Sequence, residues 1–521
     1  MKGPAGSGVH PDVHPAPRNS QIRIGLSIIS GILLAVVQPP VSLWFLAYGA
    51  LIPLLYALGE YPSHHRPFFL GFVTGVVSYL GLIYWVVVAM NTYGGIDIFT
   101  STLILVLFVL YLSLYTGCFA ALVSWMETRL SIPAYLSAPI LWTLLEYLRG
   151  AALTGFPWSF LAHSQYTFLS FIQVASITGT YFISFLIVCV NCIIYCMATG
   201  KRISRIYAGA VCFVIAACLI YGVDRLRDAD EGTLKTAIIQ GNIRQDVKWD
   251  EGFKTRTVAL YHEKTLQAGN GTDLVIWPET AMPFIFDDEP YAREHVKGLS
   301  SRVGTDILFG TIWKDGQGKF YNSSYIMGKR GETAGIYNKE HLVPFGEYTP
   351  LVTYLPILAS LTAQGSGFSS GGTHEPIIAD TGKIGILICY EGVFPRITCE
   401  TVRRGAQVLV NLTNDAWYDK TSAPFQHFAF YVFRAVETDR YVLRSANTGI
   451  SAIIDPRGRI KEKTPIFEER ILKGTFSLRN GLTFYVRHGD FFILLVLIAL
   501  LAMVSAQCFV VLRSRRQPTN G

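Results

Sequence analysis

Cys389 is the residue with the clearest potential for chemistry. It ends a short apolar run that begins at Lys383, and Tyr390 and Glu391 follow it directly. Such a run is typical of a buried strand, and α/β folds place their active sites at the carboxyl ends of these strands. A thiol there is a candidate nucleophile. The alternative is an inert core thiol, since cysteine commonly packs as a small apolar side chain.

Two other segments place ionisable side chains at comparable positions. Glu279 closes a Trp-Pro-Glu tripeptide after the apolar run 274–276, and Lys339 and Glu347 lie in the segment 338–347. A carboxylate, an amine and a thiol that meet at strand ends would form a nucleophilic site. Each also has a structural interpretation, because Glu279 would cap a helix and Lys339 would be a solvated loop charge.

The elements around these residues predict an α/β domain whose sheets are covered by helices, because strand-like and helix-like runs alternate. The strand-like runs lie near Thr236–Gln240, Leu274–Trp277, Ile307–Thr311, Ser324–Met327, Lys383–Cys389, Val408–Asn411 and Ile450–Ile454. The helix-like runs lie near Phe253–Ala268, Tyr291–Arg302, Arg396–Arg404 and Gln426–Thr438.

The segment from Pro344 to Gly372 interrupts this alternation and is rich in proline, glycine and large apolar residues. Loops of this length are usually functional or disordered, and this one is too apolar for simple disorder. We predict either a lid that dips toward a bilayer or a short buried helix from Leu351 to Leu361.

The composition indicates that much of the chain lies in lipid, because 51% of its 521 residues are hydrophobic and only 16% are charged. Eight apolar stretches approach the roughly 20 residues that cross a bilayer core. They lie near Ile22–Val37, Val41–Leu58, Phe68–Met90, Phe99–Trp125, Ala134–Leu148, Phe168–Met197, Ile206–Val223 and Phe491–Leu512. The fifth ends with Glu146 and Arg149, which we expect at the interface, where they terminate the span. The alternative is a broken or re-entrant segment whose charges face protein.

Basic residues predict the orientation. Clusters at 18–23, 201–205 and 513–516 fall on the same side of eight spans, which the positive-inside rule makes cytoplasmic. We therefore expect a disordered cytoplasmic tail (1–20), a seven-span bundle (21–224), an outward-facing catalytic domain (225–489), an eighth helix (490–513) and a cytoplasmic tail (514–521).

Cysteine usage and motif content restrict the chemistry further. Only Cys389 and Cys399, of nine cysteines, fall in the outward-facing segment. An oxidising compartment would allow them to pair, but we favour a free Cys389, since a turn and a helix start separate the two. The sequence contains no zinc, Walker, dinucleotide or nucleic-acid-binding motif, so we expect no metal, no cofactor and no nucleic-acid partner.

Together these motifs resemble the nitrilase superfamily, whose members use a Glu, Lys and Cys triad. With the spans, they resemble its apolipoprotein N-acyltransferase family. The segments 155–158, 240–243, 248–250 and 411–418 add to the similarity. The resemblance implies an α-helical bundle joined to an αββα sandwich, in the bacterial inner membrane, with the sandwich on the periplasmic side. It also implies a phospholipid acyl donor, a thioester on Cys389 and, as acceptor, the α-amine of a diacylated apolipoprotein.

Chemistry gives each residue of this triad a role. A thiol with a pKa of about 8.5 is mostly protonated at neutral pH, so it needs a base or a cation nearby. Glu279 would take the Cys389 proton. Lys339 and the main-chain N–H of Tyr390 would hold the negative charge that develops on the carbonyl oxygen. Glu347 and Glu391 are predicted to support the site, or alternatively to orient Lys339 as structural partners.

Several neighbouring residues have weaker assignments. Trp249, Tyr390, Trp417 and Tyr418 are candidates for an acyl pocket, although buried aromatic residues usually pack a core. Asn414 and Asp415 have a turn-forming interpretation, and we expect His427 to be a satisfied helix histidine.

Two other functions compete with acyl transfer. A membrane-anchored amidase or nitrile hydrolase would use the same triad and pass the acyl group to water, but it hardly needs eight spans. A transporter or receptor would leave the thiol, amine and carboxylates unexplained. We expect a monomer in the bilayer.

Overall fold

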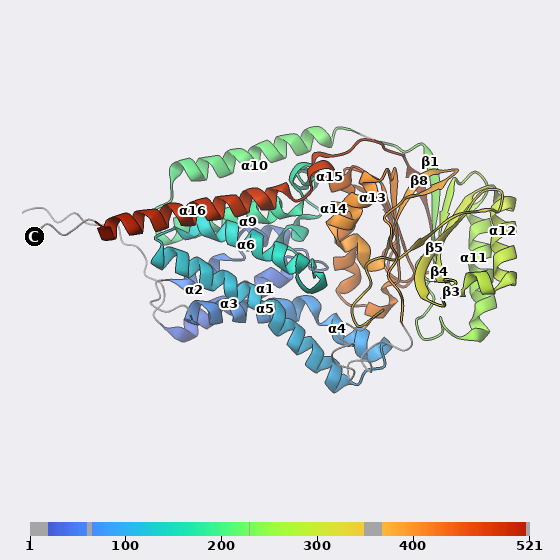
Figure 1. The fold of residues 1–521 in the computed structure, drawn as a ribbon, viewed down its shortest axis with the longest axis horizontal. Coiled ribbons are helices and arrows are strands. Elements are labelled where there is room, and N and C mark those ends of the chain that lie inside the picture. Colours follow the sequence, from blue (N-terminus) through green and yellow to red (C-terminus); the bar gives the residue numbers. More distant parts are fainter. Residues whose placement is uncertain (1–18, 60–64, 229, 349–366, 517–521) are drawn as a thin grey trace, which may run out of the picture.

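The computed structural model describes residues 19–59, 65–228, 230–348 and 367–516. A helical bundle occupies one end of the molecule and an α/β domain the other, and the last helix returns along the bundle (Figure 1). Most of the predicted lid, with the alternative helix from Leu351 to Leu361, lies outside the described residues, as does most of the N-terminal tail.

Two sheets form the α/β domain. The first has the order β13-β1-β2-β4-β5-β6, with β3 beside β4, and the second has the order β12-β11-β10-β9-β8-β7. The first contains β1 (Leu234–Gln240), β2 (Leu274–Ile276), β3 (Met282–Ile285), β4 (Asp306–Lys314), β5 (Phe320–Met327), β6 (Thr333–Asn338) and β13 (Arg470–Phe476). The second contains β7 (Ile377–Ala379), β8 (Gly382–Ile388), β9 (Val408–Thr413), β10 (Val442–Ala446), β11 (Ala452–Ile454) and β12 (Ile460–Lys463).

Branched apolar side chains fill the space between the two sheets, among them Ile238, Ile276, Ile388 and Leu412. On the outer face of the first sheet pack α11 (Lys254–Ala268) and α12 (Pro290–Val303), and on that of the second pack α13 (Pro395–Arg403) and α14 (Ala423–Thr438). The predicted α/β domain with helix-covered sheets is confirmed. Almost every residue of α14 is buried, because this helix lies between a sheet and the bundle (Figure 1).

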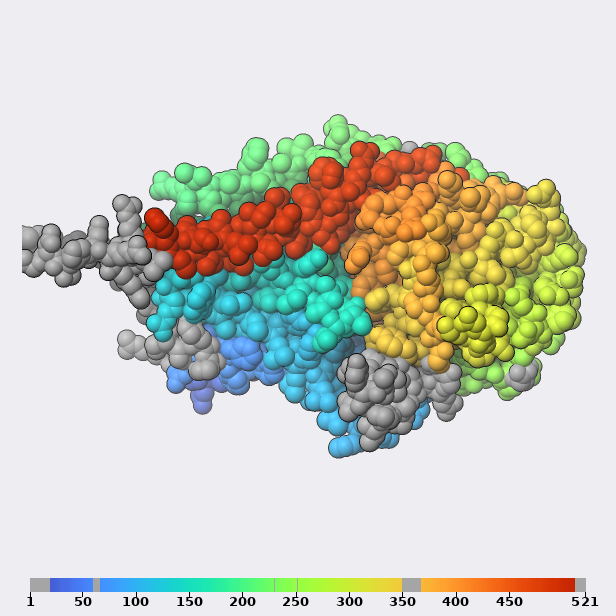
Figure 2. Space-filling view, viewed as in Figure 1, coloured from blue at the N-terminus to red at the C-terminus, as the bar shows by residue number. Residues whose placement is uncertain are grey.

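The bundle contains helices of very different lengths. They are α1 (Ser20–Val36), α2 (Ile52–Leu58), α3 (His65–Ile83), α4 (Trp85–Val88), α5 (Ile98–Arg129), α6 (Ala134–Ala151), α7 (Leu169–Ile172), α8 (Ala175–Thr178), α9 (Thr180–Thr199) and α10 (Arg205–Arg225). After the α/β domain come α15 (Phe484–His488) and α16 (Phe491–Arg516). In the space-filling view, α10 and α16 run along the outside of the bundle (Figure 2).

Among the described helices, five are long and apolar enough to cross a membrane: α3, α5, α9, α10 and α16. The count of eight spans therefore stays a prediction. The second predicted stretch is broken into a 3-10 turn, Trp44–Tyr48, and the seven-residue α2. The sixth begins with two single-turn helices before α9, and α1 has 17 residues.

Glu146 and Arg149 face protein, as in the alternative of a segment whose charges lie against its neighbours, and their position at an interface stays a prediction. Both side chains are buried, at 5% and 4% exposure. Glu146 accepts a 2.8 Å hydrogen bond from the main-chain N–H of Leu161, and Arg149 Nη1 donates to the carbonyl oxygens of Phe156 and Trp158. The two charges face protein because they satisfy the main chain of the loop that follows α6.

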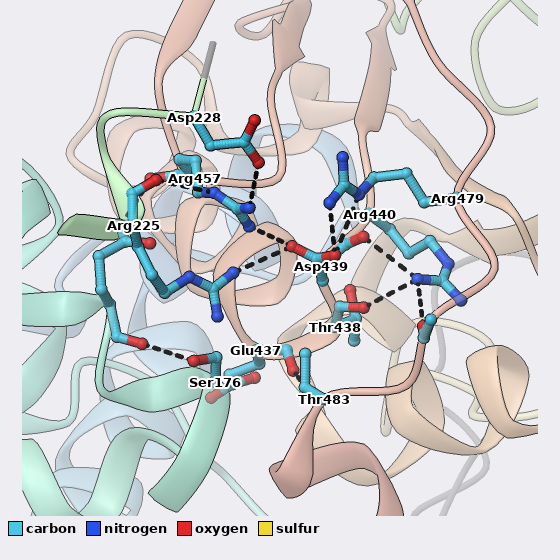
Figure 3. A network of polar contacts seen from close by, with 12 residues as sticks. Ser176, Arg225, Asp228, Glu437, Thr438, Asp439, Arg440, Arg457, Arg479 and Thr483 are labelled. Carbon is cyan, nitrogen blue, oxygen red and sulfur yellow. Dashed lines mark hydrogen bonds and ion pairs between the residues drawn. The ribbon is translucent and has the colours of Figure 1, made fainter. Parts of the chain in front are cut away.

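A polar network joins the bundle to the α/β domain. Asp439, just after α14, accepts hydrogen bonds from Arg225 at the end of α10 and from Arg457 and Arg479 (Figure 3). Arg457 also pairs with Asp228. One carboxylate thus holds three guanidinium groups from separate segments.

Candidate active site

Strand ends from both sheets bring the predicted triad together. Cys389 follows β8, Lys339 follows β6, and Glu279 lies in the turn after β2. The main-chain N–H of Asn414, which follows β9, donates a 2.8 Å hydrogen bond to Oε2 of Glu279. The site therefore lies where the strand ends of the two sheets meet.

Cys389 is held in an uncommon backbone conformation. It starts a 3-10 turn, Cys389–Val393, rather than ending the strand as predicted, and its φ is +52°. Tyr431 Oη donates a 2.8 Å hydrogen bond to its carbonyl oxygen. A Cβ on Gly392 would lie 2.2 Å from the Tyr431 ring, so only glycine permits this approach. Such strained residues, fixed by their surroundings, are typical of nucleophiles at strand-to-helix turns.

Glu279, Lys339 and Glu347 form a buried charged cluster. Lys339 Nζ lies 2.9 Å from Oε1 of Glu347 and 3.7 Å from Oε1 of Glu279. Asn322 Nδ2 donates to both carboxylates, at 2.8 Å each, and Oε2 of Glu347 accepts from the main-chain N–H of Val343 at 2.8 Å. Glu347 thus orients Lys339.

The charges around the Cys389 thiol shift its pKa in opposite directions. Burial and the carboxylate of Glu279 raise the pKa of Cys389, whereas the ammonium of Lys339 lowers it. Burial alone would lower the pKa of Lys339, but Glu347 and Glu279 raise it above its usual value. Lys339 is therefore a permanent cation beside a thiol that ionises only when a base removes its proton. This arrangement suits nucleophilic attack on a carbonyl group.

Lys248 is a second buried amine at the site, which the sequence reasoning missed as a functional residue. Its Nζ donates a 3.1 Å hydrogen bond to the carbonyl oxygen of Glu279, and its side chain is 2% exposed. Burial lowers its pKa to about 7, although the charges of Glu279 and Cys389 raise it. In the sequence, Lys248 stands out only as part of the segment 248–250, which adds to the family resemblance.

Glu391 supports the loops around the site rather than contacting the Lys339 amine. Its Oε2 accepts from the main-chain N–H of Ile388 at 2.6 Å, and its Oε1 accepts from Glu340 N, His341 N and Tyr337 Oη. Burial raises its pKa to about 7, against the effect of these donors and of the Lys339 charge. It ties the turn at Cys389 to the segment that carries Lys339.

An apolar wall connects the site to the bundle. Tyr390 packs on Phe394 and Trp158, with ring centroids 4.9 and 6.4 Å apart. Its hydroxyl donates to the carbonyl oxygen of Gly155. The same cluster includes Leu82 of α3, Trp85 of α4, and Leu105, Val109 and Leu112 of α5.

The other aromatic candidates lie in different environments. Tyr418 packs edge-on against Trp85, with ring centroids 4.9 Å apart, and belongs to the apolar wall. The ring of Trp417 packs edge-on against that of Tyr93, with ring centroids 6.3 Å apart. Trp249 is 47% exposed.

Behind Cys389 lies a buried polar network. Asp415 Oδ2 accepts from Arg444 Nη2 at 2.8 Å, and its Oδ1 lies 2.9 Å from His427 Nδ1. Thr413 Oγ1 lies 3.4 Å from Cys389 Sγ. His427 is a satisfied helix histidine, as expected, but Asp415 is part of this network rather than only of a turn.

The cysteines and potential metal ligands among the described residues are not arranged as a disulfide or as a metal-binding cluster. All nine cysteines are free. Over the part of the chain that the structure describes, no three His, Cys, Asp or Glu side chains are grouped so that they could hold a metal ion.

Known proteins resemble both parts of the chain. The family described as apolipoprotein N-acyltransferase N-terminal domain matches residues 30–193, and the carbon-nitrogen hydrolase family matches residues 235–480. Among solved structures, Nit3 of Saccharomyces cerevisiae, from the nitrilase superfamily, is 20% identical, with 47% of this chain and 91% of that chain covered and a TM-score of 0.37.

Curated relatives match nearly the whole chain. Apolipoprotein N-acyltransferase of Geobacter metallireducens is 40% identical over 494 residues, which cover 92% of this chain and 94% of the relative. The enzyme of Methylococcus capsulatus is 32% identical over 514 residues, 95% of this chain and 97% of the relative. With this identity over almost its full length, the chain belongs to the apolipoprotein N-acyltransferase family.

Proposed function

We propose that the protein moves an acyl chain from a phospholipid, through a thioester on Cys389, to the α-amine of the diacylglyceryl-cysteine of an apolipoprotein. The observation that carries this proposal is the apolar wall at Tyr390, which is continuous with α3, α4 and α5. A nucleophile beside a surface shared with membrane helices is suited to a substrate with long acyl chains.

In the first half-reaction, Glu279 takes the proton of Cys389 while Sγ attacks the ester carbonyl. Lys339 and the main-chain N–H of Tyr390 stabilise the oxyanion. The ester C–O bond breaks, the leaving alkoxide takes the proton from Glu279, and a lysophospholipid departs. In the second half-reaction the neutral amine attacks the thioester, Glu279 accepts its proton, and that proton returns to the Cys389 thiolate.

The finer topology is part of the same proposal. Eight spans would place the segment 225–489 on the periplasmic side of the bacterial inner membrane, with the bundle at 21–224, the last span at 490–513 and cytoplasmic tails at 1–20 and 514–521. The basic clusters support this orientation. We propose a monomer as the working unit.

Intact-mass analysis of the purified protein after incubation with phospholipid tests the nucleophile. We expect an adduct of one acyl chain that hydroxylamine removes, and no adduct on Cys389→Ala. A matched control is Cys399→Ala, which removes the other thiol of the α/β domain. An adduct that persists on Cys389→Ala would show that another residue is acylated.

The compound that accepts the acyl group from the adduct distinguishes acyl transfer from hydrolysis. A diacylated lipopeptide with a free amine is expected to discharge the adduct and gain one acyl chain, whereas an N-acetylated lipopeptide leaves the adduct in place. A membrane-anchored amidase or nitrile hydrolase would discharge the adduct equally fast in buffer alone.

A further inference from the structure

The hydroxyl of Thr413 lies between two acceptors of different kinds. Its Oγ1 is 3.4 Å from Cys389 Sγ and 3.1 Å from Asp415 Oδ1. Thr413 is the last residue of β9 and is fully buried. Because a hydroxyl has a single proton to donate, it can serve only one of these acceptors at a time.

Asp415 does not depend on this hydrogen bond. Arg444 Nη2 lies 2.8 Å from its Oδ2 and His427 Nδ1 lies 2.9 Å from its Oδ1, and all three side chains are buried. Burial alone would raise the pKa of Asp415, but Arg444 and His427 hold it below its usual range. The carboxylate thus stays ionised and keeps two partners when the Thr413 hydroxyl points elsewhere.

The preference of the hydroxyl changes with the state of the thiol. Beside a neutral thiol, a weak acceptor, the ionised carboxylate is the better partner. Beside a thiolate, the sulfur carries a full charge in a buried site, and a hydrogen bond to a charged group is stronger than one to a neutral group. Rotation about the Cβ–Oγ1 bond is sufficient to change partners.

We propose that Thr413 is a positioning residue whose hydroxyl turns from Asp415 to Cys389 Sγ when the thiol ionises. The inference rests on the proposed role of Cys389 as the nucleophile. No proton leaves Thr413: the thiol proton goes to Glu279, and the Thr413 O–H bond only changes direction. Asp415 therefore acts as a rest position for the hydroxyl and not as a base.

The test is the pH dependence of Cys389 alkylation by iodoacetamide in detergent, followed by mass analysis of the peptide that contains Cys389. Thr413→Val removes the hydroxyl and keeps the shape, and Thr413→Ser keeps the hydroxyl. We expect Thr413→Val to raise the apparent pKa of the thiol by about one to two units, with about 10- to 100-fold slower alkylation at neutral pH. Thr413→Ser should stay within a few-fold of the wild type.

Thr401→Val is the matched control, because Thr401 is also buried and its hydroxyl donates only to the helix carbonyl of Ile397. It should leave the profile unchanged. A Thr413→Val profile that superimposes on the wild type overturns the proposal, and so does an equal shift in Thr413→Ser, which would point to packing instead. Alkylation needs no lipid, so failure here is distinct from failure of the wild type to form an acyl adduct.

Discussion

Both carboxylate oxygens of Glu279 accept a hydrogen bond from the protein itself. Asn322 Nδ2 donates to Oε1 and Asn414 N donates to Oε2, each at 2.8 Å. The plane of the proposed base is thus set by the fold, and its orientation costs no further entropy when the reaction begins. Asn322 also donates to Glu347, so one amide orients both carboxylates that flank Lys339.

Lys248 gives the stability of the protein a specific pH dependence. Its pKa of about 7 lies below the value of about 10.4 for a lysine in an unfolded chain. Between these values the unfolded state binds more protons than the folded state, so the contribution of Lys248 to stability rises with pH. We expect Lys248→Met to be stabilised relative to the wild type at pH 7, with a smaller advantage at pH 9.

Melting temperatures in detergent at the two pH values measure this difference. Lys319→Met is the control, because it makes the same change of side chain at an exposed lysine. An advantage of Lys248→Met that is the same at pH 7 and pH 9 would contradict the assignment.

At the scale of elements, α6 acts on the active site through the loop that follows it. Arg149 holds the carbonyl oxygens of Phe156 and Trp158, and Trp158 and Gly155 contact Tyr390. A cation of the bundle therefore positions one wall of the proposed acyl site.

Removal of this cation should loosen the wall. We expect Arg149→Met to lower acyl transfer at least 10-fold and to reduce the melting temperature, because two buried carbonyl groups lose their donor and Glu146 loses the nearby charge. Arg129→Met, at an exposed position at the end of α5, should have little effect.

The double variant Glu146→Gln and Arg149→Met distinguishes two effects of losing Arg149: the unpaired buried charge of Glu146 and the lost positioning of the loop. It should regain some of the lost melting temperature, since no unpaired charge stays buried, while transfer remains low. Recovery of full transfer in the double variant would mean that Arg149 does not position the loop.

Part of this arrangement was predictable from the sequence. β2 and β8 are mostly apolar runs, as buried parallel strands usually are, and Glu279 and Cys389 follow them closely. β6 was missed because it is a half-exposed edge strand without an apolar run, and β10 because Arg444 and Ser445 interrupt it. Lys248 was missed because a lysine in a polar turn is ordinarily solvated, and only tertiary packing buries it.

At the scale of the whole molecule, Asp439 connects the two halves. Arg225 comes from the bundle, whereas Arg457 and Arg479 come from the α/β domain. Burial would raise the pKa of Asp439, but these arginines hold it below its usual value. Its stabilising charge is therefore present at neutral pH and is lost only as the pH falls through the lowered pKa.

We expect Asp439→Asn to lower the melting temperature by several degrees at pH 7, because three guanidinium groups lose their shared carboxylate. Asp224→Asn is the matched control, since Asp224 lies beside Arg225 at the end of α10 and pairs with Arg227 at an exposed position. Thermal unfolding monitored by tryptophan fluorescence measures both. Equal melting temperatures for the two variants would show that the network does not couple the halves.

The buried pair in α6 also bears on how the chain is made. On insertion scales a charged residue costs about 2.5–3.5 kcal/mol at the centre of a span. Glu146 and Arg149 lie in the C-terminal half of α6, which is not among the five described helices long and apolar enough to cross a membrane, so α6 alone is a poor candidate for release from a translocon into lipid. The ring of Tyr79, on α3, packs against Arg149 and is synthesised earlier, but the carbonyl groups of Phe156 and Trp158 are synthesised later. Biogenesis should therefore retain α6 beside helices already made until the ribosome has supplied the next ten residues or so.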